Sequence, residues 1–236
     1  MSKITTVLFD LDGTLLPMDQ DVFVNAYFGL LAKKLAPYGY EKEKLIPAIW
    51  QGTAAMVKND GKATNETVFW NFFATCFGED VRKDEPIFED YYRNEFAQVR
   101  ASCGFTPKAA EVVAYLKGRG FRLALATNPI FPAIATESRI RWAGLNKGDF
   151  ELVTTYENSH HCKPNPAYYA EVLKKLSCTP EECLMVGNDA TEDLAAAKLG
   201  IHVFLLTDCL INKKEADVAA VPHGGFDDLL AYLKTV

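Results

Sequence analysis

The sequence lacks the features that mark membrane, secreted and disulfide-stapled proteins. No apolar stretch approaches the about 18 residues that a membrane-spanning helix needs, and residues 1–9 do not have the pattern of a signal peptide. The six cysteines include no Cys-x-x-Cys pair, and a chain of 236 residues is long enough to hold a core without disulfides. We therefore expect reduced thiols, no membrane partner and a cytoplasmic location.

Basic residues are also fewer than acidic ones. The 31 Asp and Glu residues outnumber the 25 Lys and Arg residues, which gives a formal net charge of -6. Such a chain, without a cluster of basic side chains, is a poor candidate for binding nucleic acid or an anionic membrane surface. The apolar content of 49% and the charged content of 24% are typical of a globular protein. We expect an enzyme that acts on a small molecule, as a monomer or a small homo-oligomer.

Short apolar runs alternate with helical patterns over most of the chain. The runs are nearly continuous, which is typical of strands buried on both faces of a parallel sheet. They cover residues 4–9, 121–126, 150–155, 183–186 and 201–206. Helical patterns begin at Thr106-Pro107 and Asn165-Pro166, where an N-cap residue precedes proline, and also cover 189–199 and 226–233. The alternation predicts an α/β fold with a Rossmann-like, doubly wound parallel sheet of five principal strands.

One long segment interrupts this alternation. Residues 17–103 contain no convincing strand, and about half of the aromatic residues lie there. Apolar periodicity, punctuated by Gly, Pro and Asn, predicts four helices over 20–36, 42–58, 65–77 and 84–100. We predict that residues 17–103 form a helical cap domain inserted into an α/β catalytic core made of 1–16 and 104–236. Its hinges are expected near 15–19 and 100–105.

Two carboxylates follow the first predicted strand, in the segment Asp10-Leu11-Asp12-Gly13-Thr14. The carboxyl end of a strand is where open α/β sheets bind ligands. Two anions so close repel each other unless a partner offsets their charge. Mg²⁺ is a suitable partner because it uses one or two carboxylates together with phosphate oxygens. Taken alone, the segment could also be an ordinary polar turn.

A second pair of acids, Asp189 and Asp193, follows the fourth predicted strand. If the helix has begun there, their spacing of four places both on one face of it. Acids that merely favour the positive end of the helix dipole are the alternative interpretation. If the first and fourth strands are neighbours, however, these acids meet those of the first strand. Converging carboxylates would then form a metal site.

Uncharged and basic groups complete the pattern. Thr127 and Asn128 follow the second predicted strand and offer a hydroxyl and an amide to an oxyanion. Lys163 could act as a point cation toward phosphate and carboxylate. Individually these are weak signals, because polar strand exits and solvated lysines are common.

Together, the four elements resemble the four ordered motifs of the haloacid dehalogenase-like phosphohydrolase superfamily. That pattern is Asp-x-Asp-Gly-Thr, then Ser/Thr, then Lys, then Gly-(x)-Asp-x-x-x-Asp, and the resemblance covers residues 1–16 and 104–210. One branch of phosphatases in the superfamily carries a helical cap after the first motif, which would explain the insertion. Asn188 is an extra residue within the fourth motif, but it leaves the spacing of Asp189 and Asp193 intact.

The resemblance implies a role for each matching residue. Asp10 would be the nucleophile that forms an aspartyl-phosphate, and Asp12 the general acid and base. Mg²⁺ would be held by Asp10, the backbone carbonyl of Asp12 and Asp189, with Asp193 nearby or bridging through water. The phosphoryl group would be bound by Thr127 and Lys163, with Asn128 in support. The expected activity is Mg²⁺-dependent hydrolysis of a small phosphorylated metabolite. The acid at position 12 favours phosphoryl transfer, because dehalogenating relatives lack it.

Two other functions remain open. A phosphomutase would pass the phosphoryl group to a second hydroxyl instead of water. A non-catalytic, receiver-like module would also gather acids and a lysine around Mg²⁺, although such modules are shorter and lack the cap. Within the insertion, Met18, Asp19, Phe23 and Tyr27 are candidate substrate contacts. Trp50, Trp70 and the aromatic residues in 69–73 are interpreted as helix-packing residues, with the lining of a substrate pocket or a partner surface as the alternative.

Overall fold

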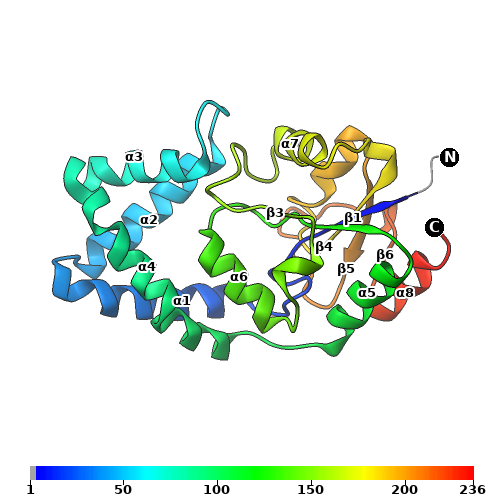
Figure 1. Cartoon of the computed structure of the whole chain (residues 1–236), viewed down its shortest axis with the longest axis horizontal. Coiled ribbons are helices and arrows are strands. Elements are labelled where there is room, and N and C mark those ends of the chain that lie inside the picture. Colours follow the sequence, from blue (N-terminus) through cyan, green and yellow to red (C-terminus); the bar gives the residue numbers. More distant parts are fainter. Residues whose placement is uncertain (1–3) are drawn as a thin grey trace.

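A six-stranded parallel sheet forms the centre of the computed structural model, which describes residues 4–236 (Figure 1). The first three residues of the predicted core lie outside the described residues. The strand order is β3-β2-β1-β4-β5-β6, and every pairing is parallel. The strands are β1 (Thr6–Phe9), β2 (Arg122–Leu125), β3 (Leu152–Val153), β4 (Cys183–Gly187), β5 (His202–Leu206) and β6 (His223–Gly224). The five predicted strands are present, and β6 was missed because two polar or small residues carry no apolar signal.

Helices cover both faces of the sheet. Successive side chains of a strand point to opposite faces, so Val7 and Phe9 belong to one apolar cluster and Leu8 to another. The first cluster is covered by α5 (Pro107–Gly118), α6 (Ala133–Trp142) and α8 (Phe226–Leu233). The second is covered by α7 (Pro166–Leu176) and a 3₁₀ helix (Leu194–Leu199), on the other side of the sheet (Figure 1). The prediction of a doubly wound α/β fold is confirmed.

Helix α6 was not predicted from the sequence. Its buried face includes Thr136, Ser138 and Arg139 beside Ala135 and Ile140. Polar side chains in buried positions break the apolar periodicity on which the prediction of a helix depends. A search for apolar periodicity therefore misses this helix, because polar side chains occupy part of its buried face.

The prediction of a helix over residues 189–199 is wrong for the first part of that segment. The segment begins as a turn and becomes helical only in the 3₁₀ stretch Leu194–Leu199. The Asp189 carboxylate accepts hydrogen bonds from the backbone N–H groups of Thr191 and Glu192, at 2.7 and 2.9 Å. Aspartate side chains commonly compete in this way with helical backbone bonds, so Asp189 and Asp193 do not share the face of an α-helix.

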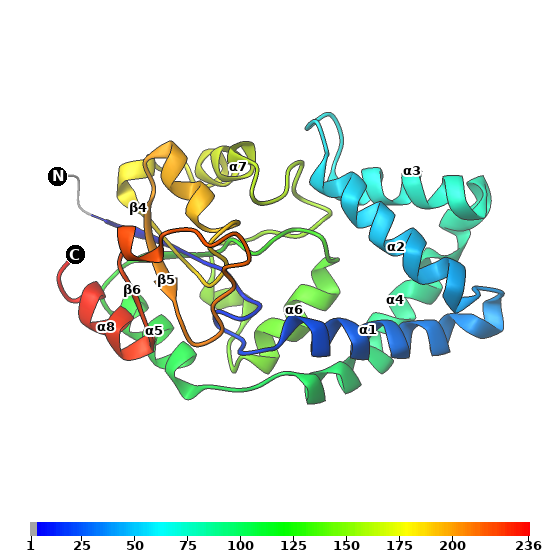
Figure 2. The same ribbon diagram turned by 180° about the vertical axis from the view of Figure 1, so that it is seen from behind.

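The insertion between β1 and β2 contains the four predicted α-helices. They are α1 (Gln20–Leu35), α2 (Lys42–Val57), α3 (Asn65–Phe77) and α4 (Glu85–Arg93). The last is shorter than expected because the chain continues as a 3₁₀ segment, Glu95–Ser102. All four lie beyond one end of the sheet, away from the C-terminus (Figure 2). No helix within residues 4–236 is both long and apolar enough to cross a membrane.

The chain enters and leaves the insertion along two adjacent segments. Met18 and Cys103 form an antiparallel bridge, and the N–H of Gly104 donates to the carbonyl of Pro17 at 2.7 Å. A Cβ at position 104 would lie 3.2 Å from that carbonyl oxygen. The two connections are therefore packed backbone against backbone, in the regions where hinges were predicted.

Candidate active site

Strand β1 lies between β2 and β4, and this order gathers the predicted site residues. The N–H of Asp10 donates to Val186 of β4 at 2.9 Å, and the N–H of Ala126 donates to Phe9 at 2.7 Å. Asp10, Thr127 and the residues after Gly187 therefore leave the sheet at the same edge. The expected neighbour relationship between the first and fourth strands is present.

The turn after β1 is locked to the turn after β4 by Asn188. Gly13 has φ +84°, and a Cβ there would lie 2.3 Å from Asn188 Nδ2, so only glycine fits. Thr14 Oγ1 donates to Asn188 Oδ1, and Asn188 Nδ2 donates to the Cys209 carbonyl, both at 2.8 Å. The residue that departs from the family pattern thus joins three loops at the carboxyl edge of the sheet.

A buried lysine joins the first and last motifs. Lys163 is 1% exposed, and its Nζ lies 2.9 Å from Asp10 Oδ1 and 2.7 Å from Asp193 Oδ1. A Cβ on Gly187 would lie 2.0 Å from Asp193 Oδ2, so the glycine of the fourth motif makes room for this carboxylate. Asp10, Lys163 and Asp193 are far apart in the sequence, and the structure brings them into one ion network.

Burial sets the protonation of this network. It raises the pKa of Asp10 to about 7; Lys163 opposes the rise, while the carboxylates of Asp193 and Asp12 add to it. For Lys163, burial favours a lower pKa, but the charges of Asp10 and Asp193 outweigh it and raise the pKa well above the ordinary value. Lys163 therefore stays protonated at neutral pH, whereas Asp10 would gain from a further cation.

Asp12 has a partner that sequence reasoning missed. Its carboxylate forms a close ion pair with Arg139, which is 1% exposed and whose guanidinium carbon lies 4.3 Å from the centre of the Phe131 ring. Burial raises the pKa of Asp12, and the charges of Arg139 and Lys163 oppose the rise. Asp12 Oδ1 is buried without a hydrogen-bond partner in the described part of the chain. No sequence signal distinguishes Arg139 from a solvated arginine of a short helix.

Thr127 and Asn128 are held in place by hydrogen bonds with side chains from other segments of the core. Thr127 is 3% exposed, and its carbonyl accepts hydrogen bonds from Thr154 Oγ1 at 2.7 Å and from the Tyr168 hydroxyl at 2.9 Å. Asn128 Nδ2 donates to Glu192 Oε1 at 2.9 Å, whereas Asn128 Oδ1 is buried without a partner among residues 4–236. Burial raises the pKa of Glu192 to about 8. These contacts fix the backbone at the end of β2 and leave the Thr127 side chain near the edge where Asp10 lies.

The Asp189 side chain contacts backbone groups, whereas the other three acids of the site pair with buried cations. One of its carboxylate oxygens caps the turn described above. The backbone N–H of Asp189 donates to Asp193 Oδ2 at 2.9 Å. Among residues 4–236, no group of three or more His, Cys, Asp and Glu side chains is arranged so that it could hold a metal ion. The ligand set implied by the family resemblance does not need such a group, because it takes the backbone carbonyl of Asp12 together with Asp10 and Asp189.

The donor chemistry nevertheless fits Mg²⁺. This ion takes hard oxygen ligands and often binds through one or two carboxylates, with waters and phosphate oxygens completing the shell. Among residues 4–236, the carboxylates of Asp10, Asp12 and Asp193 pair with two buried cations, Lys163 and Arg139. An excess of negative charge and the unpaired Asp12 Oδ1 therefore remain in a buried place.

A cavity of about 310 Å³ lies between the inserted helices and the loops that follow β2 and β3. Of the four candidate substrate contacts, Tyr27 lines it. Asp19 instead caps α1, accepting hydrogen bonds from the backbone of Asp21 and Val22, and Phe23 packs against Phe131 with ring centres 6.3 Å apart. Met18 takes part in the bridge between the two connections.

Comparison with known proteins identifies the family. The model of the haloacid dehalogenase-like hydrolases matches residues 4–200. The chain belongs to this family. The prediction that it is a hydrolase is confirmed, and its helical insertion after β1 agrees with the branch predicted from the motifs.

Individual relatives of this haloacid dehalogenase-like hydrolase are distant. Pyrophosphatase PpaX of Bacillus mycoides is 25% identical over 188 residues, covering 79% of this chain and 76% of that protein. Among solved structures, a predicted phosphoglycolate phosphatase from Haemophilus somnus has a TM-score of 0.61 at 20% identity, with 99% of each chain covered. The 2-haloacid dehalogenase from Pseudomonas syringae has a TM-score of 0.65 at 20% identity, covering 98% of this chain and 99% of that one.

A further solved relative is described as bound to magnesium. YfnB from Bacillus subtilis has a TM-score of 0.59 at 19% identity, covering 99% of this chain and all of that one, and its structure is said to reveal interdomain movement. At such identities the structural likenesses show a shared fold. What the relatives act on belongs to those proteins.

Proposed function

We propose that the protein is a Mg²⁺-dependent phosphomonoester hydrolase that acts on a small phosphorylated metabolite. The observation that carries this proposal is Lys163, buried between Asp10 and Asp193 at the carboxyl edge of the sheet. A protonated lysine beside a strand-end carboxylate supplies a place for a phosphoryl group next to a nucleophile. The family supports hydrolysis of phosphate esters as the class of reaction.

In the first step, a carboxylate oxygen of Asp10 attacks phosphorus. The bond between phosphorus and the ester oxygen breaks, and Asp12 gives its proton to that leaving oxygen. The pKa of Asp12 is raised by burial, which favours the protonated form that this step needs. The products of the step are the free alcohol and an aspartyl-phosphate at position 10.

In the second step, water attacks phosphorus. The Asp12 carboxylate takes the water proton, the bond between phosphorus and the Asp10 oxygen breaks, and inorganic phosphate leaves. Lys163 and the Thr127 hydroxyl would hold the phosphoryl oxygens through both steps, with Asn128 in support. Mg²⁺, held by Asp10, the Asp12 carbonyl and Asp189, would supply charge neutralisation when bound.

Residues 17–103 would act as a cap over a catalytic core made of 1–16 and 104–236. The adjacent connections at Pro17 and Gly104 support a pair of hinges, because both strands of the connection can bend together. The interdomain movement described for YfnB is consistent with this assignment. Closure would exclude water other than the hydrolytic one.

A phosphomutase differs from this proposal only in the acceptor of the phosphoryl group. The family match and the helical insertion argue against a receiver-like module. The relatives named PpaX are pyrophosphatases, so inorganic pyrophosphate is a reasonable substrate to test. A cavity with largely apolar walls beside the site favours an ester with an organic group.

The test is a phosphate-release screen of sugar, nucleotide, amine and carboxylic acid phosphates and pyrophosphate, with Mg²⁺ or with EDTA. We expect turnover with Mg²⁺, loss in EDTA and recovery on adding Mg²⁺ back. Asp10→Asn should lower kcat on the best substrate by at least about 1,000-fold. Full turnover by Asp10→Asn, or full activity in EDTA, would contradict the proposal, and a phosphorylated isomer as the main product would indicate a mutase.

A further inference from the structure

We propose that the substrate's organic part is an apolar group that carries a protonated amine, bound in the cavity between the inserted helices and the sheet. This rests on the proposed phosphatase activity and adds the chemical class of the substrate. The cavity has a volume of about 310 Å³, within the range of small-molecule sites. The proposal follows from three observations: its aromatic walls, its carboxylates and its place next to the reaction site.

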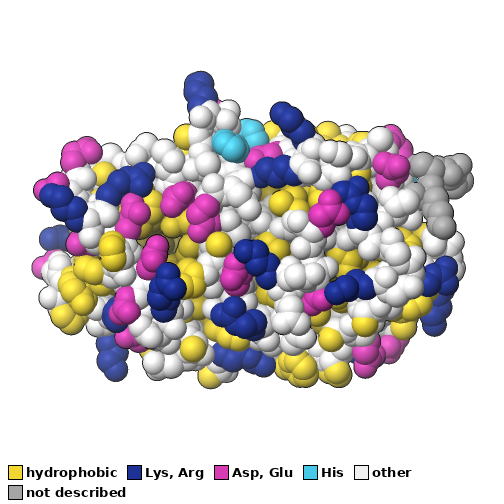
Figure 3. Space-filling model, viewed as in Figure 1, with side chains coloured by type: hydrophobic (Ala, Val, Ile, Leu, Met, Phe, Trp, Pro, Cys, Tyr) yellow, Lys and Arg dark blue, Asp and Glu magenta, His cyan; other side chains and the backbone are white. Residues whose placement is uncertain are grey.

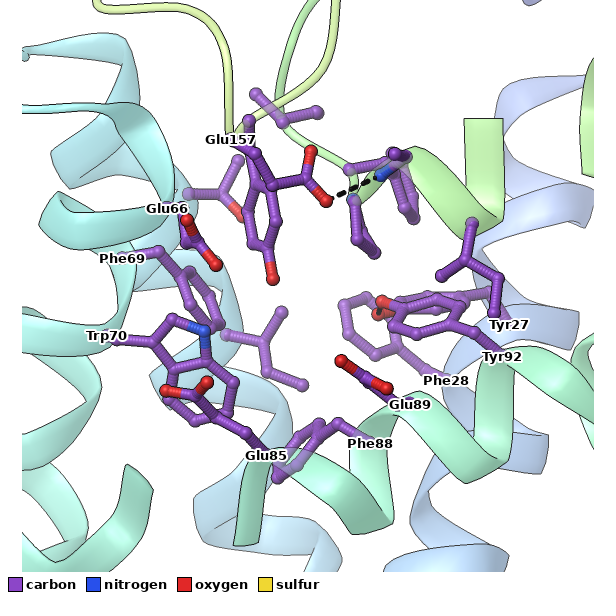
Figure 4. Close-up of a pocket in the computed structure, with 18 of the residues that line it drawn as sticks. Tyr27, Phe28, Glu66, Phe69, Trp70, Glu85, Phe88, Glu89, Tyr92 and Glu157 are labelled. Carbon is purple, nitrogen blue, oxygen red and sulfur yellow. Dashed lines mark hydrogen bonds between the residues drawn. The ribbon is translucent and has the colours of Figure 1, made fainter. Parts of the chain in front are cut away.

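Aromatic rings form most of the walls (Figure 4). Helix α3 contributes Phe69 and Trp70, whose rings meet edge to face with centres 5.6 Å apart. Helices α1 and α4 contribute Tyr27 and Tyr92, which stack with centres 6.4 Å apart. Walls of this kind bind flat or apolar groups, and they attract cations to the faces of the rings.

Acidic side chains stand among these rings. Glu66, Glu85, Glu89 and Glu157 line the cavity, and of the described lining residues one is cationic, Arg93. Arg93 pairs with Glu89 at 3.2 Å. In Figure 3, Asp and Glu side chains surround a hollow in the half of the molecule that holds the inserted helices. Glu85 pairs at 2.9 Å with Arg82, which lies outside the lining. Glu66 and Glu157 are therefore the two lining carboxylates without an ion pair among residues 4–236.

Glu157 has an unused acceptor. Its Oε1 accepts a hydrogen bond from the N–H of Ala133 at 2.8 Å, whereas its Oε2 is buried and has no partner within residues 4–236. Burial raises the pKa of Glu66, and the charges of Glu157 and Glu85 raise it further. An ammonium group would donate to Glu157 Oε2 and relieve the repulsion between Glu157 and Glu66.

Trp70 and Tyr156 contribute further aromatic surface to the cavity. Trp70 is 3% exposed, and its indole N–H is buried without a hydrogen-bond partner among residues 4–236. Both residues line the cavity. A ring that faces a carboxylate in a partly dry space is a strong binding position for an organic cation, because the cation gains from both.

The cavity lies next to the reaction site, with Phe131 between them. This ring lines the cavity and also lies against Arg139, the partner of Asp12. Ile130, another lining residue, is three positions after Thr127, so the chain between them spans at most about 10 Å. A phosphate at Thr127 and Lys163 and an amine in the cavity can therefore belong to one small molecule.

Other organic groups fit less well. A neutral apolar group would contact the rings but leave Glu157 Oε2 without a donor. A second carboxylate, as in a phosphorylated short acid, would be repelled by Glu66 and Glu157, which have no ion pair among residues 4–236. The cavity thus selects for charge as well as for size.

Three benzyl phosphates that differ in the charge of a small para substituent test the inference directly: 4-(aminomethyl)benzyl, 4-(hydroxymethyl)benzyl and 4-carboxybenzyl phosphate. We expect kcat/KM to fall in that order, with at least a tenfold advantage of the amine over the neutral probe. Glu157→Gln keeps an acceptor for the Ala133 N–H but removes the charge, so it should erase most of that advantage. Glu43→Gln, an exposed cap residue outside the cavity lining, is the matched control and should preserve it.

Binding of 4-(aminomethyl)benzyl alcohol separates this inference from the proposed activity. Trp50 and Trp70 line the cavity, so their fluorescence should report binding. Quenching in the wild type that is weakened at least fivefold in Glu157→Gln supports the cation site, even in a protein that hydrolyses no probe. Equal turnover of the three probes, or a preference for the carboxylate, would overturn it, as would an amine preference that survives in Glu157→Gln.

Discussion

Asp12 and Arg139 form an ion pair at the end of β1, and Arg139 is held in turn against the ring of Phe131. The pair orients the carboxylate while Asp12 Oδ1 stays buried and unpaired within the described chain. A general acid needs such an arrangement, because one oxygen must be fixed and the other free for the proton in transit. Arg139 is therefore a positioning residue for the proposed chemistry.

Arg139→Lys should keep the fold and lower kcat by about 10- to 100-fold, because lysine lacks the planar fork and stacks less well on the ring. Arg139 lowers the pKa of Asp12, so its weaker replacement should move the basic limb of the kcat–pH profile to higher pH. Arg139→Ala leaves a buried charge unpaired and should cost about 3–5 kcal/mol of unfolding free energy. An Arg139→Lys profile that coincides with the wild type would contradict the positioning role.

Gly187→Ala should disrupt the site from within β4. The added Cβ would meet Asp193 Oδ2 at 2.0 Å and push that carboxylate away from Lys163. We expect a loss of about 1–3 kcal/mol in urea unfolding and a larger relative loss of activity. Gly148→Ala is the matched control, because a Cβ there meets nothing within 4 Å. If both variants behaved alike, Gly187 would have no special packing role.

The stability of the metal-free protein should fall as the pH rises from about 5 to 8. Burial raises the pKa of Glu192 from 4.5 to about 8, so the folded state binds a proton that the unfolded state releases. That stability is fully present below pH 4.5 and is lost as the pH rises through 8, with a slope of up to about 1.4 kcal/mol per pH unit. Asp10 and Asp12 act in the same direction.

Glu192→Gln isolates this contribution. Glutamine retains an acceptor for Asn128 Nδ2 but does not titrate. In EDTA, thermal melts between pH 5 and pH 9 should show a shallower decline for the variant than for the wild type. Parallel declines would show that Glu192 titrates at its ordinary pKa.

A tether across the two connections should restrict the cap. Met18 and Cys103 are bridge partners, and such partners lie about 4.5–5.5 Å apart at Cα, within reach of a disulfide. We expect oxidised Met18→Cys to lose turnover and to recover it with dithiothreitol. Wild type under the same oxidant is the control, because its own cysteines could also be oxidised. All six are free in the described chain, and the sulfurs of Cys178 and Cys183 lie 3.2 Å apart. Unchanged turnover in a fully tethered protein would argue against hinges at these positions.

Much of the sheet could be predicted because its strands are buried on both faces and followed by turn residues. The positions of Asp10 and Thr127 follow directly, since neighbouring parallel strands end at one edge. The turn at Asp189 could not be predicted, because its side chain replaces helical hydrogen bonds in a way that spacing does not reveal. The roles of the motif residues remain predictions.

Residues that act through tertiary contacts were the hardest to find. Arg139 matters because of Asp12, 127 positions away, and nothing local marks it. Trp70 illustrates this for the aromatic residues of the insertion: it is a packing residue at 3% exposure and also lines the cavity proposed to bind substrate. Likewise, the acids of the cavity come from α3, α4 and the loop after β3, so their convergence depends on the fold.

The adjacent connections at Pro17 and Gly104 also bear on how such proteins diversify. Because the chain departs from the sheet and returns to it at neighbouring points, the insertion can lengthen, shorten or be exchanged without altering the register of β1 and β2. The chemistry proposed at Asp10 and the selection of substrates can therefore evolve at different rates. A graft of another cap between these two points should inherit the hydrolytic machinery and bring its own choice of substrate.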